Sequence, residues 1–141
     1  MELKIKTGID KALFGMKFKD IEALYGKPDA IEIEEVEDEN VLYIYNKQKF
    51  RFTFYEDEDL RMAYILSSNS EAQLHGKIII GSPVEEIKLL IGSVWEENSA
   101  DITKVHYHED SWFTLYSEFD VVTKFEFGAG FTDDDEFDWK F

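Results

Sequence analysis

The sequence predicts an α+β fold in which two tandem units, each a helix followed by antiparallel strands, form one body. Two internal realignments lead to this prediction. Residues 15–26 realign on residues 81–92 at an offset of 66, with both glycines, an isoleucine and a leucine in matching positions. Residues 52–55 (Phe-Thr-Phe-Tyr) realign on residues 113–116 (Phe-Thr-Leu-Tyr) at an offset of 61, so the second unit keeps the element order and has a shorter loop.

The two units, residues 1–70 and 71–141, are expected to share one core. A unit of this size buries little apolar surface by itself, and neighbouring repeats usually bury a continuous core. Only the short polar stretch of residues 67–70 separates the strands of the first unit from the second unit. The chain is therefore predicted to be a single domain, residues 1–141, made of two repeats.

Each unit is predicted to contain one amphipathic helix. In the second unit, Ser82 and Glu85 have the spacing of a capping box, and Pro83 suits the first helical position. Apolar residues then recur at helical spacing until Gly92 ends the helix. In the first unit, residues 18–25 carry the matching apolar stripe.

Strands are predicted after each helix, because β-branched and aromatic runs alternate there with turn residues. In the first unit they span residues 30–36, 41–45, 49–55 and 60–67, and in the second unit residues 94–97, 102–107, 111–116 and 121–127. The stretches upstream of the two helices, residues 9–14 and 75–80, fit either a short helix or a turn.

Alternation along the strands predicts which side chains face the helices. Those expected to point toward the helices are Phe50, Phe52, Phe54, Phe113 and Leu115. Those expected on the opposite face are Arg51, Thr53, Tyr55, Trp112, Thr114 and Tyr116. Tyr43 and Tyr45 join this outer face if their apolar neighbours point inward. Large rings on an outer sheet face suit recognition of a partner; the alternative is ordinary cross-strand pairing, with the C-terminal tail folded over them.

The charge of the chain favours some partners and excludes others. Thirty-one acidic and fifteen basic residues give a net charge of −16. The excess is larger in residues 71–141, with 16 acidic and 5 basic residues, than in residues 1–70, with 15 and 10. Such a field attracts cationic proteins and also serves solubility. It repels phosphate groups, so we expect no binding to nucleic acid or membrane.

Cysteine usage and the N-terminus bear on location. The chain has no cysteine, which removes disulfides, thiolate nucleophiles and Cys-ligated zinc. Residues 1–6 contain no apolar signal segment, and no stretch approaches the roughly 18 apolar residues of a membrane span. These features predict a cytoplasmic protein.

Catalytic and cofactor motifs are missing from the sequence. It contains no Gly-x-Ser-x-Gly, no phosphate-binding glycine loop and no calcium-loop spacing. His106 and His108 share one face of a predicted strand, as metal ligands often do, but no motif supplies a third ligand. We therefore expect no enzyme, no cofactor and no metal, while metal binding by the two histidines stays open.

The densest acidic run lies near the C-terminus, at Asp133, Asp134, Asp135 and Glu136. Aromatic residues are interleaved with these acids at Phe131, Phe137, Trp139 and Phe141. A purely solvated acidic tail, which is the alternative, needs no such rings. The run is therefore predicted to dock onto a partner rich in lysine and arginine.

The element order resembles the β-lactamase inhibitor protein. The resemblance rests on Leu-Tyr-Gly-Lys-Pro at residues 24–28, the strands that follow, and the return of Leu-Ile-Gly at residues 90–92 with further strands. It covers nearly the whole chain and implies a tandem sheet whose open concave face grips an enzyme with aromatic and acidic side chains. The chain lacks the cysteines and the secretion signal of that inhibitor, which implies a different target.

The chain is also similar to immunity proteins of bacterial contact-dependent and polymorphic toxin systems, which are small, acidic and cytoplasmic. This resemblance implies a protein that neutralises a basic toxin, often a nuclease, by covering its active site or another essential surface. The predicted function is therefore an inhibitor of a cationic toxin enzyme. The residues expected to bind it are Tyr55, Trp112, Tyr116, Asp133, Asp134, Asp135 and Glu136. The alternatives are a non-inhibitory protein- or ligand-binding module and, more distantly, a hydrolase that uses carboxylates or the two histidines.

Overall fold

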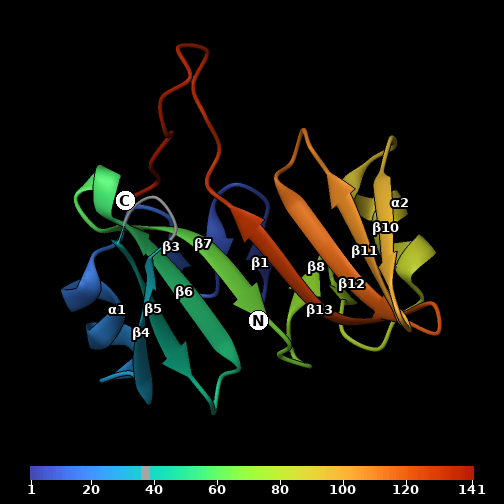
Figure 1. Ribbon diagram of the computed structural model, residues 1–141, viewed down its shortest axis with the longest axis horizontal. Helices are drawn as coiled ribbons and strands as arrows, with labels where there is room; N and C mark the ends of the chain where they lie inside the picture. Colours follow the sequence, from blue (N-terminus) through green and yellow to red (C-terminus); the bar gives the residue numbers. More distant parts are fainter. Residues whose placement is uncertain (36–38) are drawn as a thin grey trace.

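A computed structural model describes residues 1–35 and 39–141, and its largest feature is an eight-stranded antiparallel sheet. The strand order is β10-β11-β12-β13-β7-β6-β5-β4 (Figure 1). The strands are β4 (Ala30–Glu35), β5 (Glu39–Tyr45), β6 (Phe50–Tyr55), β7 (Arg61–Ser67), β10 (Glu96–Ala100), β11 (Thr103–His108), β12 (Phe113–Glu118) and β13 (Val121–Gly128). Each half of the chain supplies four neighbouring strands, and the halves meet where β7 and β13 pair antiparallel. Val36, the last residue of one predicted strand, lies outside the described residues.

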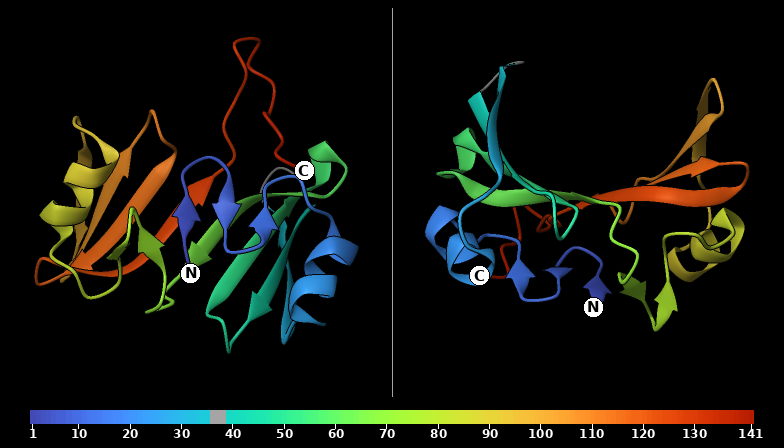
Figure 2. Two further views of the ribbon diagram at one scale, coloured as in Figure 1. Left: turned by 180° about the vertical axis from the view of Figure 1, so that it is seen from behind. Right: turned by 90° about the horizontal axis from the view of Figure 1, so that it is seen from below.

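Two helices and two small sheets cover one face of this large sheet. The helices are α1 (Phe18–Tyr25) and α2 (Val84–Ile91), and η1 (Glu56–Glu58) is a 3-10 turn between β6 and β7. The small sheets consist of β1 (Leu3–Lys4), β2 (Gly8–Ile9) and β3 (Ala12–Leu13), and of β8 (Gln73–Leu74) and β9 (Lys77–Ile78). The stretches upstream of the helices are therefore short strands and turns. Figure 2 shows that both ends of the large sheet rise away from the helices, so the helix-free face is concave.

The helix boundaries confirm the predicted glycine ends of both helices and correct the predicted start of α2. The backbone N–H of Lys17 donates to the Asp20 carboxylate at 3.0 Å, which anchors the first turn of α1. Gly26 then ends α1 with a φ of 79°, a conformation that favours glycine. The predicted capping box of α2 is wrong, because Pro83 occupies the cap position and the Ser82 hydroxyl donates to the carbonyl of Ile78.

One continuous core lies between the large sheet and the elements that cover it. All five side chains predicted to face the helices are buried. Tyr43 and Tyr45 do not join the outer face, because the β5–β6 register pairs Tyr43 with Phe52 and Tyr45 with Phe50, on the helix side. Their hydroxyls donate to the Glu22 carboxylate and to the Gly26 carbonyl of the α1 segment. Tyrosine reaches polar partners at the rim of a buried layer with its hydroxyl, so period-two alternation alone could not assign its face.

The structure is thus an α+β fold with two helices and mainly antiparallel sheets. In the described part of the chain, neither helix is long and apolar enough to span a membrane.

Candidate functional site

The acidic run near the C-terminus forms the tip of a hairpin that projects from the end of β13 (Figure 1). Phe131 and Phe137 face each other across an antiparallel bridge. The backbone N–H of Thr132 donates to the carbonyl of Glu136 at 2.7 Å, and that of Asp135 donates back to Thr132 at 3.0 Å. Residues 133–136, called the acidic tip below, are all exposed. The four carboxylates are therefore held on an ordered loop beyond the body of the protein.

Aromatic rings are stacked at the base of the hairpin. Phe137 lies between Phe131 and Trp139, with ring centroids 4.6 and 4.7 Å apart. Phe131 packs on Trp112 at 5.2 Å, and Phe137 packs on Tyr55 at 5.9 Å. We call Tyr55, Trp112, Phe131, Phe137 and Trp139 the aromatic base. Because its rings come from β6, the β11–β12 turn and both arms of the hairpin, only the folded chain assembles it.

The C-terminal tail is anchored on the helix side of the sheet. The backbone N–H of Lys140 donates to the carbonyl of Phe14 at 3.0 Å. A Cβ at Gly15 would lie 2.9 Å from the Phe141 carbonyl oxygen, and Gly15 has a φ of 109°, so this position requires glycine. Arg61 lies over the Trp139 ring at 6.0 Å. The hairpin is thus fastened at both of its ends.

A small pocket opens between the hairpin and the concave face of the sheet. Its walls are Tyr55, Ala63, Tyr64, Trp112, Gly128, Ala129, Phe131 and Phe137, and its volume is about 90 Å³. The pairing of β7 and β13 places Gly128 opposite Tyr64. A Cβ at Gly128 would lie 2.8 Å from the Tyr64 ring, so glycine lets the ring lie against the β13 backbone. The lining is almost entirely apolar.

The predicted binding residues lie in two places. Tyr55, Trp112 and the acidic tip lie together at the hairpin end of the molecule. Trp112 belongs to the β11–β12 turn rather than to a strand, and 38% of its surface is exposed. Tyr116 lies four residues further along the chain, in β12, which puts it roughly 13 Å away. Tyr116 therefore belongs to the concave sheet face and not to the aromatic base.

The concave face carries partly buried tyrosines beside carboxylates. The hydroxyl of Tyr116 donates to Glu126 at 2.6 Å, and the Lys124 ammonium lies 4.4 Å from the ring centroid. Burial raises the pKa of Tyr116, and the hydrogen bond to Glu126 raises it further. Burial also raises the pKa of Tyr55, and the charges of Glu34 and Glu126 add to this effect. Glu126 thus lies near both tyrosines, and both remain neutral hydrogen-bond donors at physiological pH.

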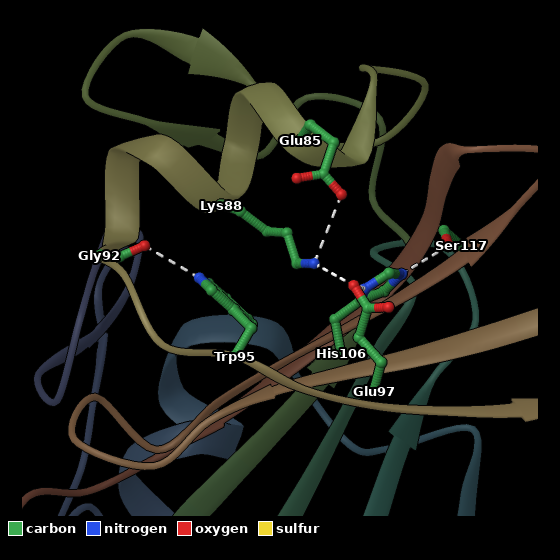
Figure 3. Close-up of polar contacts among 7 residues, drawn as sticks. All are labelled: Glu85, Lys88, Gly92, Trp95, Glu97, His106 and Ser117. Carbon is green, nitrogen blue, oxygen red and sulfur yellow. Dashed lines mark hydrogen bonds and ion pairs between the residues drawn. The ribbon is translucent and has the colours of Figure 1, made fainter.

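A second polar cluster lies on the opposite, helix-covered face (Figure 3). His106 contacts the Ser117 hydroxyl through Nε2 at 2.7 Å and Glu97 through Nδ1 at 3.2 Å. Lys88 of α2 contacts the same Glu97 oxygen and also Glu85. Burial lowers the pKa of His106, and the Lys88 charge lowers it further. The order serine, histidine, carboxylate is that of a nucleophilic triad.

The burial of this cluster argues against nucleophilic catalysis. Ser117 and His106 are 1% and 2% exposed, so a substrate carbonyl cannot approach the hydroxyl. His108 faces the same layer, where it contacts the Ser111 hydroxyl at 2.7 Å and the Ser93 carbonyl at 3.0 Å. Both imidazoles thus use their two nitrogens in hydrogen bonds within the protein. Among the described residues, no group of three His, Asp or Glu side chains is placed to hold a metal ion.

Several residues at these sites were not identified from the sequence. Tyr64 and Ala129 line the pocket, and Ser117 completes the buried cluster. The sequence could have placed Tyr64 on the outer face. It alternates with apolar neighbours in β7, and it pairs with Thr53 of β6, which was already predicted on that face. Ser117 carried no such signal, since its partner His106 lies eleven residues away on another strand.

Comparison with known proteins bears on the fold. No protein-family model and no curated protein sequence matches the chain. An extracellular protein containing an SCP domain from Bacillus anthracis str. Ames matches with a TM-score of 0.58 and 14% identity, over 90% of this chain and 50% of that chain. A DUF4309 family protein (YjgB) from Bacillus subtilis subsp. subtilis str. 168 matches with a TM-score of 0.49 and 14% identity, over 88% and 82%. This chain spans half the length of the Bacillus anthracis chain, and at such low identity the likeness concerns the fold alone.

Proposed function

We propose that this protein is a cytoplasmic immunity or inhibitor protein, which binds a cationic toxin enzyme of the nuclease type and blocks it. The observation that carries the proposal is the position of the acidic tip directly above the aromatic base. Protein interfaces commonly depend on a few aromatic anchors inside a polar rim. Four exposed carboxylates on a fastened hairpin complement an active site that is itself built to hold phosphate.

The proposal also concerns how the fold is built from two similar halves. We infer that residues 1–70 and 71–141 are tandem repeats of the kind found in the β-lactamase inhibitor protein. The supporting facts are that each half has one helix followed by four strands, and that the eight strands run outward from the central β7–β13 pair in mirrored order. In such an arrangement the concave face is the surface that receives the enzyme, with Tyr116 on it and the hairpin at its edge.

The proposal is tested by capture of the partner from producing cells, followed by a toxicity assay. The bait proteins are the unaltered chain, a Trp112→Ala chain, and a chain with Asp133→Asn and Asp134→Asn. We expect a basic protein that the unaltered chain retains and both variants retain at least ~10-fold less well. That protein should be toxic when expressed alone and harmless when expressed with the unaltered chain.

Two matched controls separate the site from general effects. Phe119→Ala removes an 81% exposed ring from the β12–β13 turn, at the opposite end of the sheet. Asp101→Asn with Asp120→Asn removes the same number of charges as the hairpin variant, from exposed turns at that opposite end. Both controls should retain the partner normally. If the Asp101→Asn, Asp120→Asn control lost as much binding as the hairpin variant, only general charge attraction would remain of the proposal.

Salt dependence tests the electrostatic part. Steering by opposite charges mainly accelerates association, and salt screens it. Association with the captured partner should therefore slow between about 50 and 500 mM salt, with dissociation changed much less. Binding that is indifferent to salt would contradict this part of the proposal.

The apolar pocket favours a second candidate, a binding module that does not inhibit its partner. This candidate predicts a partner or small apolar ligand that depends on Trp112 but keeps its activity when bound. Cell fractionation tests the location separately: recovery of the protein outside the cytoplasm would overturn the immunity proposal and favour this candidate.

A further inference from the structure

We propose that the pocket beside the hairpin receives one aliphatic side chain of the partner, from a segment in which lysine or arginine flanks that side chain. This inference rests on the proposed function and specifies the chemistry of the segment recognised. The pocket and the acidic tip are parts of one structural unit, because Phe131 and Phe137 line the pocket and also begin and end the acidic loop.

The size and lining of the pocket indicate an aliphatic occupant. A closed apolar cavity of about 150 Å³ holds a benzene ring. The volume of about 90 Å³ here is smaller, and suits a side chain such as leucine or methionine. The rings of Tyr64, Trp112 and Phe131 supply apolar walls, and glycine at position 128 lets the Tyr64 ring lie against the β13 backbone.

The charges around the pocket indicate which residues flank the aliphatic side chain in the partner segment. The acidic tip extends above the pocket. Two exposed acids of η1, Glu56 and Asp57, follow directly after Tyr55 in the pocket wall. Glu34 and Glu126 lie close enough to Tyr55 to affect its titration. Three cations also lie at this end. Arg61 and Lys140 contact Trp139 and Asp138 of the C-terminal arm. The Lys6 side chain lies against Gly130 in the other arm of the hairpin. A cationic segment can therefore approach the pocket opening across carboxylates.

The three tryptophans make this occupancy directly measurable. Trp112 lines the pocket and Trp139 stacks on Phe137 behind it. Trp95 donates its indole N–H to the Gly92 carbonyl under α2, away from the hairpin, and serves as an internal reference. Indole signals in a nitrogen–proton NMR spectrum report on each separately, once Trp→Phe variants assign them.

The experiment titrates the full chain with capped five-residue peptides that contain no tryptophan. Arg-Lys-Leu-Lys-Arg should shift the Trp112 signal with a dissociation constant on the order of 1 mM and leave the Trp95 signal in place. Arg-Lys-Ala-Lys-Arg should bind at least ~10-fold more weakly, because it lacks the buried side chain. Phe131→Ala and Trp112→Ala should each weaken the leucine peptide to the level of the alanine peptide; Phe119→Ala should not.

Three outcomes would overturn the inference. They are equal binding of the two peptides, equal shifts of the Trp95 and Trp112 signals, and no shift up to about ten times the expected dissociation constant. For Trp112→Ala the Trp139 signal replaces the lost one, and the dispersion of the backbone spectrum confirms that each variant is folded. A toxin that the unaltered chain inhibits and that Trp112→Ala binds equally well would refute the pocket and the aromatic anchor, while inhibition of a toxin by this protein would stand. If the peptide bound in a leucine-dependent way but no inhibited toxin were found, the pocket would stand and the proposed function would fail.

Discussion

The layer beneath α1 is aromatic, whereas the layer beneath α2 combines apolar side chains with a buried polar cluster, although both helices cover the same sheet from the same side. Under α1, Phe18 stacks on Tyr43 at 4.9 Å and Tyr25 packs edge-on against Phe50 at 5.6 Å. Under α2, Lys88 and His106 converge on Glu97. One scaffold therefore supports two different kinds of interior.

In each half, the strand register places one of these differing side chains opposite a buried phenylalanine. Tyr43 pairs with Phe52 in one half, and His108 pairs with Phe113 in the other. In the helices, Lys88 lies 66 positions after Glu22. Alternation decides which side a residue faces, but a polar side chain is accepted inside wherever its polar atoms find partners. Among the described residues that condition holds, since no buried side-chain nitrogen or oxygen lacks a hydrogen-bond partner.

The largest expected effect tests a feature found in both halves, a fully buried phenylalanine in the large sheet. Phe52 and Phe113 are both 0% exposed, so Phe52→Ala and Phe113→Ala should each lower the free energy of unfolding by about 3–5 kcal/mol. Urea denaturation measures this, and Phe119→Ala, at an exposed turn, should change it by less than about 0.5 kcal/mol. A cost below about 1 kcal/mol for Phe113→Ala would mean that the polar layer replaces its ring with other contacts.

An intermediate effect tests the feature in which the halves differ, the buried polar cluster beneath α2. Lys88→Met keeps the length of the buried side chain and removes its charge-assisted bonds, which should cost about 2 kcal/mol. Glu22→Gln, at the corresponding position of α1, should cost less than about 1 kcal/mol because Gln still accepts from the Tyr43 hydroxyl. Adding Glu97→Gln to Lys88→Met should cost little more, since the two side chains act as a pair. Fully additive losses would show that the pair is not coupled.

The polar layer should also make the protein sensitive to acid. The folded state holds the pKa of His106 below its usual value through burial and the Lys88 charge. The unfolded chain binds a proton there near pH 6.5, so the free energy of unfolding should fall as pH drops below about 6.5. The pKa of Glu97 is lowered by the hydrogen bond and charge of Lys88, and its contribution is lost at still lower pH. His106→Gln should remove the first of these two losses in denaturation curves measured between about pH 7 and 5.

The smallest effect belongs to the aromatic layer and lies at alkaline pH. Burial, together with the Glu22 charge, raises the pKa of Tyr43 and of Tyr45 to about 12. The unfolded chain loses these protons near pH 10 and the folded chain does not, so stability should fall as pH rises from about 10 to 12. Tyr43→Phe should cost about 1 kcal/mol at neutral pH and flatten the alkaline slope. An unchanged slope would place the alkaline sensitivity in other tyrosines, such as Tyr116.

By itself, the sequence determined both helices, the order of the strands that follow them and the inward phenylalanines. These features follow from local periodicity and from strong stop signals such as Gly26 and Gly92, which act whatever the rest of the chain does. It also predicted an acidic segment interleaved with aromatic residues. It did not show that this segment is a fastened hairpin, because its ties to Phe14 and Gly15 join residues about 125 positions apart.

The tertiary structure alone decided the faces of the tyrosines and the contents of the second layer. A tyrosine or histidine inside a strand fits either face, and its choice depends on whether a partner such as Glu22 or Ser117 lies opposite. The pocket likewise depends on β7 and β13 meeting, since that pairing sets Tyr64 over Gly128 beside Trp112. Contacts between strands so distant in sequence leave no periodic signal, so the position of the candidate site became visible only in the folded chain.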